Sequence, residues 1–267
     1  MKKIAHILGI FMIFSLPNLH AQSLNNFRFG FQLSPTFSKI GTSDAKINSN
    51  GSSLGVLGIK IGMKGEYNIT PEGNYAITSG LGLAFSQGGK LLHDVGGNFW
   101  AGAELSESKF NSGEKPLPDG VNLKYNLQYF EIPLGLKMRT GDFGYLRYFA
   151  EIPVFTLGIL TQARGAIEGT GVATEKENIR GAVNLFNLSW GFGGGIEYSV
   201  SEKTALVAGI YYQQGFLDVT KDSGAYKAVR NAGTDNILGN EDDGYDKRGE
   251  NSKATLGTIV LHLGVLF

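Results

Sequence analysis

Between Leu123 and Leu160 the sequence contains two runs in which apolar and polar residues alternate, and residues 140–144, which include two glycines, separate them. Successive side chains of a β-strand point to opposite faces of the sheet, so a period of two indicates strands and not helices. Two such runs beside a short glycine-containing connector predict a β-hairpin. Both runs contain the tripeptide Glu-Ile-Pro, at residues 131–133 and 151–153. Variants of this hairpin recur along the chain.

The first run changes the parity of its apolar residues near its middle. Up to Tyr129 these residues have odd numbers, and from Ile132 they have even numbers. A slip of one residue moves every later side chain to the opposite face of a strand. We therefore expect a β-bulge at Tyr129, Phe130 and Pro133, which would keep the apolar side chains on one face. Proline has no amide hydrogen for the strand ladder, and Pro133 fits this interpretation.

Eight alternating segments are expected along the chain, at residues 27–34, 57–67, 75–85, 122–139, 147–159, 186–198, 204–216 and 259–267. Three of the connections have about three to five residues, and the other four have about 16 to nearly 40. Transmembrane barrels combine short periplasmic turns with long external loops in this way. The sequence therefore predicts an all-β fold, an eight-stranded antiparallel transmembrane β-barrel with short periplasmic turns and long extracellular loops.

Alternation alone does not say which face of the barrel is outside, because a lipocalin-type soluble barrel is apolar within and a membrane barrel is apolar without. The polar faces are mostly Gly, Ala and Ser with isolated charges, too uncharged for a sheet that faces water. Aromatic residues near the strand ends suit an interfacial girdle: Phe27, Tyr67, Tyr75, Tyr129, Tyr148 and Tyr198. Phe267 ends the last alternating segment, as the assembly signal of many outer-membrane barrels does. Lipid and the barrel-assembly machinery are the partners that this orientation implies.

The first 21 residues have the pattern of a secretory signal peptide. Lys2 and Lys3 precede an apolar stretch, residues 4–16, and a small residue, Ala21, stands at the expected cleavage site. Residues 22–267 would then form the barrel domain in the outer membrane. No later apolar run reaches the roughly 20 residues of a transmembrane helix, and the chain has no cysteine for disulfides.

The charge of the chain argues against nucleic-acid binding. It has 24 basic and 24 acidic residues, and loss of the two signal lysines leaves a net charge of about −2. Binding to phosphate backbones depends on clustered positive charge, which is missing here.

The segment Tyr-Phe-Glu-Ile-Pro-Leu-Gly-Leu-Lys, residues 129–137, resembles a hallmark of the PorT-type family of outer-membrane barrels. In that family a strand has the form Tyr-hydrophobic-Glu-Ile-Pro-Leu. The resemblance extends over the order of strands in the whole mature chain, although only this segment is specific. It implies an exported, porin-family-like barrel in a Gram-negative outer membrane. Members that resemble PorT itself take part in protein export by the type IX secretion system, so secretion is a role that the resemblance allows.

Charged residues on the polar faces are expected inside the barrel, because side chains fill the interior of eight strands. The expected interior charge cluster consists of Lys60, Lys124, Glu131, Lys137, Arg147 and Glu151. Further inward candidates on the polar faces of their strands are Arg28, Lys64, Glu66 and Glu197. Pairing from the turn near Asp142 places Glu151 close to Glu131, and Arg147 opposite Lys137. Two neighbouring carboxylates can act as an acid and a base. Ion pairs that fill and block the lumen are the favoured interpretation, since like charges alone would be costly there.

No catalytic or metal site stands out in the sequence. His93 lies in an expected loop, His262 has the parity of the interior, and neither stands in a Ser/His/acid arrangement. The acidic segment 234–246 offers oxygen ligands to calcium, but it does not match the EF-hand pattern, and Lys247 and Arg248 offset its charge. We expect a solvated loop there, no metal, no other cofactor and no enzymatic activity.

Two classes of function remain open. The chain is expected to be a non-enzymatic envelope or protein-secretion accessory that binds a secretion or surface protein through its long loops, since loops on rigid scaffolds often carry function. The loop at residues 87–120, with Phe99, Trp100 and Phe110, is a candidate for such contacts. The alternative is a narrow passive pore. A lipid-modifying enzyme of the outer membrane is less favoured than either.

Overall fold

The computed structural model describes residues 26–44, 46–49, 55–106, 116–231 and 244–267. Eight long strands form a closed antiparallel ring in which each strand pairs with the next along the chain and the last pairs with the first. They are β1 (Phe27–Thr42), β3 (Val56–Asn68), β4 (Tyr75–His93), β6 (Val121–Arg139), β7 (Leu146–Gly169), β9 (Phe186–Ser199), β10 (Ala205–Gly215) and β13 (Ala254–Leu266). The predicted eight-stranded antiparallel barrel is confirmed. The expected signal peptide, residues 1–21, lies outside the described residues.

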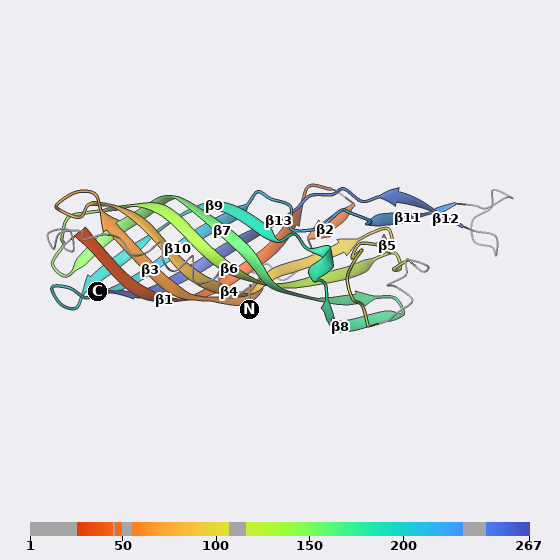
Figure 1. Ribbon diagram of the computed structural model, residues 1–267, viewed down its shortest axis with the longest axis horizontal. Helices are drawn as coiled ribbons and strands as arrows, with labels where there is room; N and C mark the ends of the chain where they lie inside the picture. The colour runs from red at the N-terminus through yellow and green to blue at the C-terminus, as the bar shows by residue number, and fades with distance from the viewer. Residues whose placement is uncertain (1–25, 45, 50–54, 107–115, 232–243) are drawn as a thin grey trace, which may run out of the picture.

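The two ends of the barrel differ in their connections (Figure 1). Three short connections, residues 69–74, 140–145 and 200–204, lie at one end, which we call the turn end, together with the start of β1 and the C-terminus. The other end, the loop end, carries the long connections with β2 (Ile47–Ser49), β5 (Gly97–Asn98), β8 (Val172–Asn178), the 3-10 element η3 (Arg180–Ala182), β11 (Tyr226–Asn231) and β12 (Gly244–Gly249).

Much of the loop end is regular structure and not irregular chain. β2 pairs with β4 and β8 pairs with β7, so both prolong the barrel wall. β5, β11 and β12 form a separate three-stranded sheet. β4 itself continues to His93, so this residue belongs to a strand and not to the expected loop. Among the described residues, no helix is long and apolar enough to cross a membrane.

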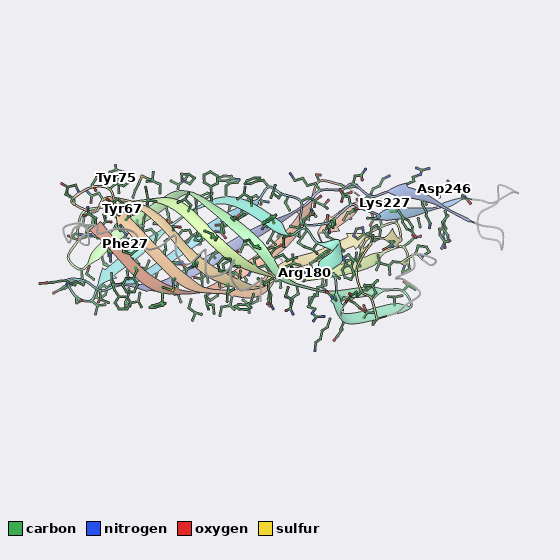
Figure 2. The ribbon with its side chains drawn as sticks, in the orientation of Figure 1. Phe27, Tyr67, Tyr75, Arg180, Lys227 and Asp246 are labelled. Carbon is green, nitrogen blue, oxygen red and sulfur yellow. The ribbon has the colours of Figure 1, made fainter. Side chains whose placement is uncertain are left out.

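A broad band of exposed apolar side chains surrounds the half of the barrel nearer the turn end (Figure 2). Phe27, Tyr67 and Tyr75 point outward at its edge, and Tyr148 and Tyr198 are exposed as well. A soluble surface rarely exposes apolar patches of this size, whereas a lipid-facing surface requires them. The sixth expected girdle residue, Tyr129, does not belong to this band, because it is 1% exposed and faces the interior.

The prediction of a β-bulge at Tyr129, Phe130 and Pro133 was wrong, because β6 contains no extra residue there. β6 alternates without a slip: odd-numbered residues face inward and even-numbered residues face outward along its length. What changes near Tyr129 is the chemistry of each face. Residues 122–128 present polar side chains outward, and residues 130–138 present apolar ones. The strand leaves water and enters the lipid-facing band at this point, so its apolar face changes from the inner one to the outer one.

The register shifts in the pairing of β6 arise from extra residues in its two neighbours, β4 and β7. Opposite Gln128 and Tyr129, the extra residue is Thr161 in β7, because Gln128 pairs with Gln162 and Tyr129 with Leu160. A second shift falls between residues 151 and 154 of β7, and a third between residues 84 and 87 of β4. A bulge bends its own strand. The barrel therefore adjusts its curvature in β4 and β7, while β6 remains regular.

Candidate functional site

The lumen near the turn end contains a network of ion pairs. Lys137 Nζ lies 2.7 Å from Glu66 Oε1 and also contacts Glu197. Arg139 joins the same two carboxylates, with its Nε 2.8 Å from Glu197 Oε1. Arg28 Nη1 lies 3.2 Å from Glu197 Oε2. The two glutamates, Lys137 and Arg139 are all buried. Each buried charge has a partner of opposite sign, which a low-dielectric interior requires.

A second group of polar side chains lies next to this network. Glu151 accepts hydrogen bonds from Lys64 Nζ and Tyr211 Oη, each at 2.6 Å, and from Thr78. Lys60 Nζ lies 2.8 Å from Glu131 Oε2. These residues come from β3, β4, β6, β7 and β10, so they connect strands on opposite sides of the barrel. All of them except Thr78 line a space of only about 60 Å³.

Four of the six residues expected in the interior charge cluster, Lys60, Glu131, Lys137 and Glu151, lie in the lumen. Lys124 does not, because it precedes the inversion of β6 and belongs to the outward polar face. The side chain of Arg147 contacts Asp142 in the short turn, with 2.9 Å between Nη2 and Oδ2. In the strand register, Lys137 lies opposite Glu151 and not opposite Arg147. The expected pairings across the hairpin were wrong because the pairing is centred on Gly144 and not on Asp142, so that Arg139 lies opposite Phe149.

Arg139 is an interior residue that the sequence analysis missed as a member of the charge cluster. The sequence does indicate that Arg139 faces inward, since it shares the parity of Lys137 at the end of the same strand. The parity shows that its side chain faces inward, but the partners of Arg139 come from β3 and β9, which are distant in sequence. His262 also faces the lumen, as its parity predicted, with Nδ1 3.5 Å from Ser34 Oγ.

Above the ion pairs, the loop end of the lumen is filled by an apolar layer. Leu123, Tyr125, Leu127 and Tyr129 face inward from β6, and Trp100 packs edge-on against Tyr125 with ring centroids 5.6 Å apart. These side chains are at most 2% exposed. The connection between β4 and β6 therefore folds back into the mouth of the barrel.

The same layer buries two residues that were candidates for partner contacts. Phe99 and Trp100 belong to the apolar layer, so neither is available at the surface. Gly165 in β7 makes room for Trp100, because a Cβ at this position would lie 2.5 Å from the Cη2 atom of the indole. Phe110, the third candidate, lies outside the described residues.

Ionic contacts join the outer segments over this layer. Lys227 Nζ lies 2.9 Å from both Asp44 Oδ2 and Glu250 Oε2, which connects three separate loop segments. The hydrogen bond from Lys227 holds the pKa of Asp44 well below its usual range. His93 stacks on Phe99, with ring centroids 3.7 Å apart, and burial lowers the pKa of its imidazole to about 4.

The part of the chain that the structure describes contains no group of three or more His, Cys, Asp or Glu side chains that would hold a metal ion. Most of the acidic segment 234–246 lies outside the described residues. Of its last residues, Asp246 accepts a hydrogen bond from Asn231 Nδ2 at 2.8 Å and thereby joins β12 to β11.

Comparisons with known proteins give one family match and several similar solved structures. Residues 20–221 match the family described as "Outer membrane protein beta-barrel domain". Among solved structures, the chain is similar to the Neisserial surface protein A, with 11% identity, a TM-score of 0.38 and coverage of 90% of this chain and 96% of that one. It is also similar to OprG from Pseudomonas aeruginosa, with 13% identity, a TM-score of 0.38 and coverage of 90% and 95%. No curated protein matches the chain.

The attachment invasion locus protein Ail of Yersinia pestis gives a similar result, with 10% identity, a TM-score of 0.35 and coverage of 90% of this chain and 98% of that one. At identities and TM-scores of this size, the likeness says nothing about what the chain binds or does. The function has to be inferred from the lumen and the outer segments themselves.

Proposed function

Because the chain belongs to the outer membrane protein β-barrel domain family, which places it in the outer membrane, we propose that it is a non-enzymatic envelope protein that binds a partner at its extracellular end. The filled lumen is the observation that supports this proposal. Paired charges occupy the half within the membrane, and an apolar layer occupies the extracellular half. A barrel of eight strands that is filled in this way acts through its outer surface and not through a channel.

The segment that offers itself to a partner is the hairpin of β11 and β12, which extends farthest from the barrel among the labelled strands (Figure 1). β12 stands at the edge of its three-stranded sheet, and residues 245–249 are exposed. An edge strand presents backbone groups that an extended segment of another protein can pair with. The partner would be a secreted or surface protein with such a segment, in keeping with the resemblance to a family that includes secretion accessories.

A replacement of residues 229–247 by a short Gly-Ser linker tests this proposal. The replacement leaves Lys227 and Glu250 in place, so the ionic contacts over the mouth are retained. The proteins that co-purify with the native protein in mild detergent, and the proteins that the cells secrete, should change. A matched control replaces residues 173–177 of β8, which prolong the barrel wall.

Both variants should still migrate as folded barrels in unheated electrophoresis samples. An unchanged set of partners and secreted proteins after removal of the β11–β12 hairpin would contradict the proposal. Loss of partners in the β8 control to the same extent would contradict it as well, because the effect would then not be specific to the hairpin.

A further inference from the structure

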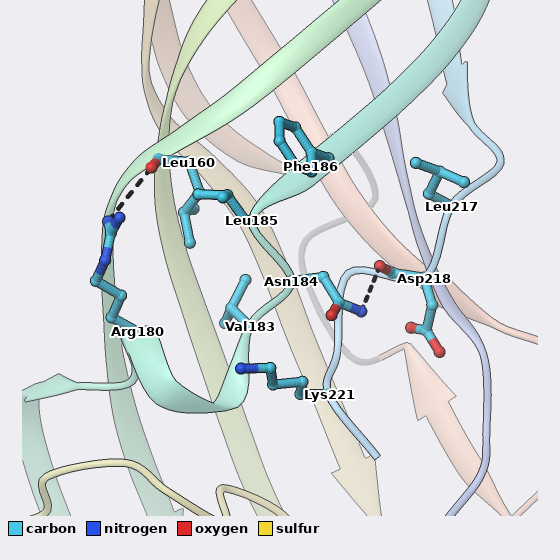
Figure 3. Close-up of a pocket in the computed structure, with 9 residues that line it drawn as sticks. All are labelled: Leu160, Arg180, Val183, Asn184, Leu185, Phe186, Leu217, Asp218 and Lys221. Atoms are coloured by element: carbon cyan, nitrogen blue, oxygen red, sulfur yellow. Dashed lines mark hydrogen bonds between the residues drawn. The ribbon is translucent and has the colours of Figure 1, made fainter. Parts of the chain in front are cut away.

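An open pocket of about 590 Å³ lies on the outside of the barrel, between the segment that leads into β9 and the segment that follows β10 (Figure 3). Leu185 and Phe186 line it from the first segment, and Leu217 and Lys221 line it from the second. Arg180, from η3, lies at its side. None of these residues takes part in the filling of the lumen or in the hairpin proposed to bind a partner.

Hydrogen bonds between the two segments fix the floor of the pocket. Asn184 N donates to Val219 O at 2.9 Å, and Lys221 N donates to Ala182 O at 3.0 Å. The Asn184 side chain donates to Asp218 O at 3.0 Å (Figure 3) and to Thr220 O at 2.7 Å. The pocket is therefore formed in the free protein, which is usual for ligand sites.

The pocket lies where the lipid-facing band ends. Leu185, Phe186 and Leu217 are exposed apolar residues that continue this band toward the loop end. In Figure 3, Lys221 lies at the opposite side of the pocket from Phe186 and Leu217. Figure 2 shows Arg180 at the level where the barrel meets the outer segments. Apolar walls beside cations at this depth match the boundary between acyl chains and headgroups.

Both cations lack a carboxylate partner among the described residues. Arg180 donates Nη1 to Leu160 O, 3.3 Å, and to Thr161 O, 2.8 Å, which leaves its Nε and Nη2 without a described acceptor. The carboxylate in the lining, Asp218, uses Oδ1 to accept bonds from Thr220 and from Ala254 N, so it holds its own loop together. The pocket is thus apolar with a free positive rim.

We propose that this pocket binds the phosphate group of an outer-leaflet lipid, with Arg180 and Lys221 contacting the phosphate and the acyl chains lying along Leu185, Phe186 and Leu217. A guanidinium offers several donors in a planar arrangement that suits phosphate oxygens, and an ammonium adds a point charge. An anionic lipid combines the two properties that the pocket matches, a phosphate and a long apolar tail. A soluble anion would leave the apolar wall uncovered.

Native mass spectrometry of the purified protein in a nonionic detergent tests the proposal, with lipid A as the probe. Dephosphorylated lipid A and inorganic phosphate are the comparison ligands. The variant Arg180→Gln/Lys221→Gln should weaken binding of lipid A by about tenfold for each cation lost, the usual effect of a hydrogen bond to a charged group. The control variant Lys176→Gln/Arg230→Gln removes two exposed cations elsewhere at the loop end and should bind normally.

Three outcomes would overturn the proposal. Equal binding of dephosphorylated lipid A would show that the phosphate is not recognised. Equal losses in the two double variants would indicate general electrostatic attraction. Inorganic phosphate that displaces lipid A at similar concentrations would assign the site to a soluble anion. Each of these results is independent of whether the β11–β12 hairpin binds a protein.

Discussion

At the scale of single residues, the mouth of the barrel depends on how large side chains fit against glycine. Trp100, which closes the mouth, lies over Gly165, and a Cβ there would also come within 3.0 Å of Ile179 Cγ2. Backbone position and side-chain volume are therefore matched at this contact, as in any close-packed interior.

Substitution Gly165→Val should displace Trp100 and open the apolar layer. Overpacking of a filled core costs about 1–3 kcal/mol, so the mouth should loosen while the ring of strands persists. Fluorescence of Trp100 in a Trp190→Phe background should shift to longer wavelength. As a control, Gly249→Val changes a glycine at the loop end that has open space around it; the same shift in this variant would contradict the packing argument.

His93 makes the mouth sensitive to pH. Burial is the main cause of its lowered pKa, Glu250 and Asp44 oppose the shift, and Lys227 reinforces it. The unfolded imidazole takes up a proton near pH 6.5, its ordinary pKa, whereas the folded one does so near pH 4. The burial of neutral His93 therefore costs the folded mouth no stability above about pH 6.5, and the mouth loses stability as pH falls from 6.5 toward 4.

We expect the amides around residues 91–100 to exchange hydrogen faster at pH 4.5 than at pH 7.5, after correction for the intrinsic rates. His93→Phe keeps an aromatic ring against Phe99 and removes the titrating group, so this dependence should disappear. A pH dependence that persists in His93→Phe would contradict the assignment to His93. Asp44 does not account for it, because the hydrogen bond from Lys227 holds the pKa of that carboxyl well below its usual range.

At the scale of elements, β6 shows how one strand is adapted to two media. Its outward face carries Gln128 beyond the band and Leu134 within it, and Leu134 is 54% exposed. Both side chains point the same way from the same strand. Their surroundings differ because the barrel is longer than the membrane-facing band.

Substitution Leu134→Arg should destabilise the barrel by about 2–4 kcal/mol, the cost of a cation on the lipid face near the midplane. Gln128→Arg, on the same face but outside the band, should change stability by less than about 1 kcal/mol. Urea unfolding in lipid vesicles measures both. Equal costs for the two variants would mean that the inversion at Tyr129 does not mark the edge of the membrane.

At the scale of the whole molecule, the filled lumen predicts that the protein does not conduct. Lys137, Arg139 and two glutamates occupy the turn end, and the apolar layer occupies the loop end. Planar-bilayer recordings of the purified protein should therefore show no stable channels. A steady conductance in the native protein would support the narrow-pore alternative and would contradict the filled lumen.

Much of the architecture could be predicted from local pattern. A period of two in eight segments and the alternation of short and long connections were enough for the ring of strands, because strand geometry acts on neighbouring residues. The polar parity of Lys60, Glu131, Lys137 and Glu151 likewise placed these side chains inside. The failures at Lys124 and Tyr129 have one cause, since both lie on the part of β6 that has left the membrane.

The sequence by itself determined the eight barrel strands and their antiparallel order, because alternation and connection length depend on residues close along the chain. Only the tertiary structure decided which medium each face meets, because this depends on height along the barrel axis. It also decided that Glu66 meets Arg139 and that Trp100 enters the mouth. Those contacts join segments far apart in sequence, whose closeness arises only when the ring of strands is closed.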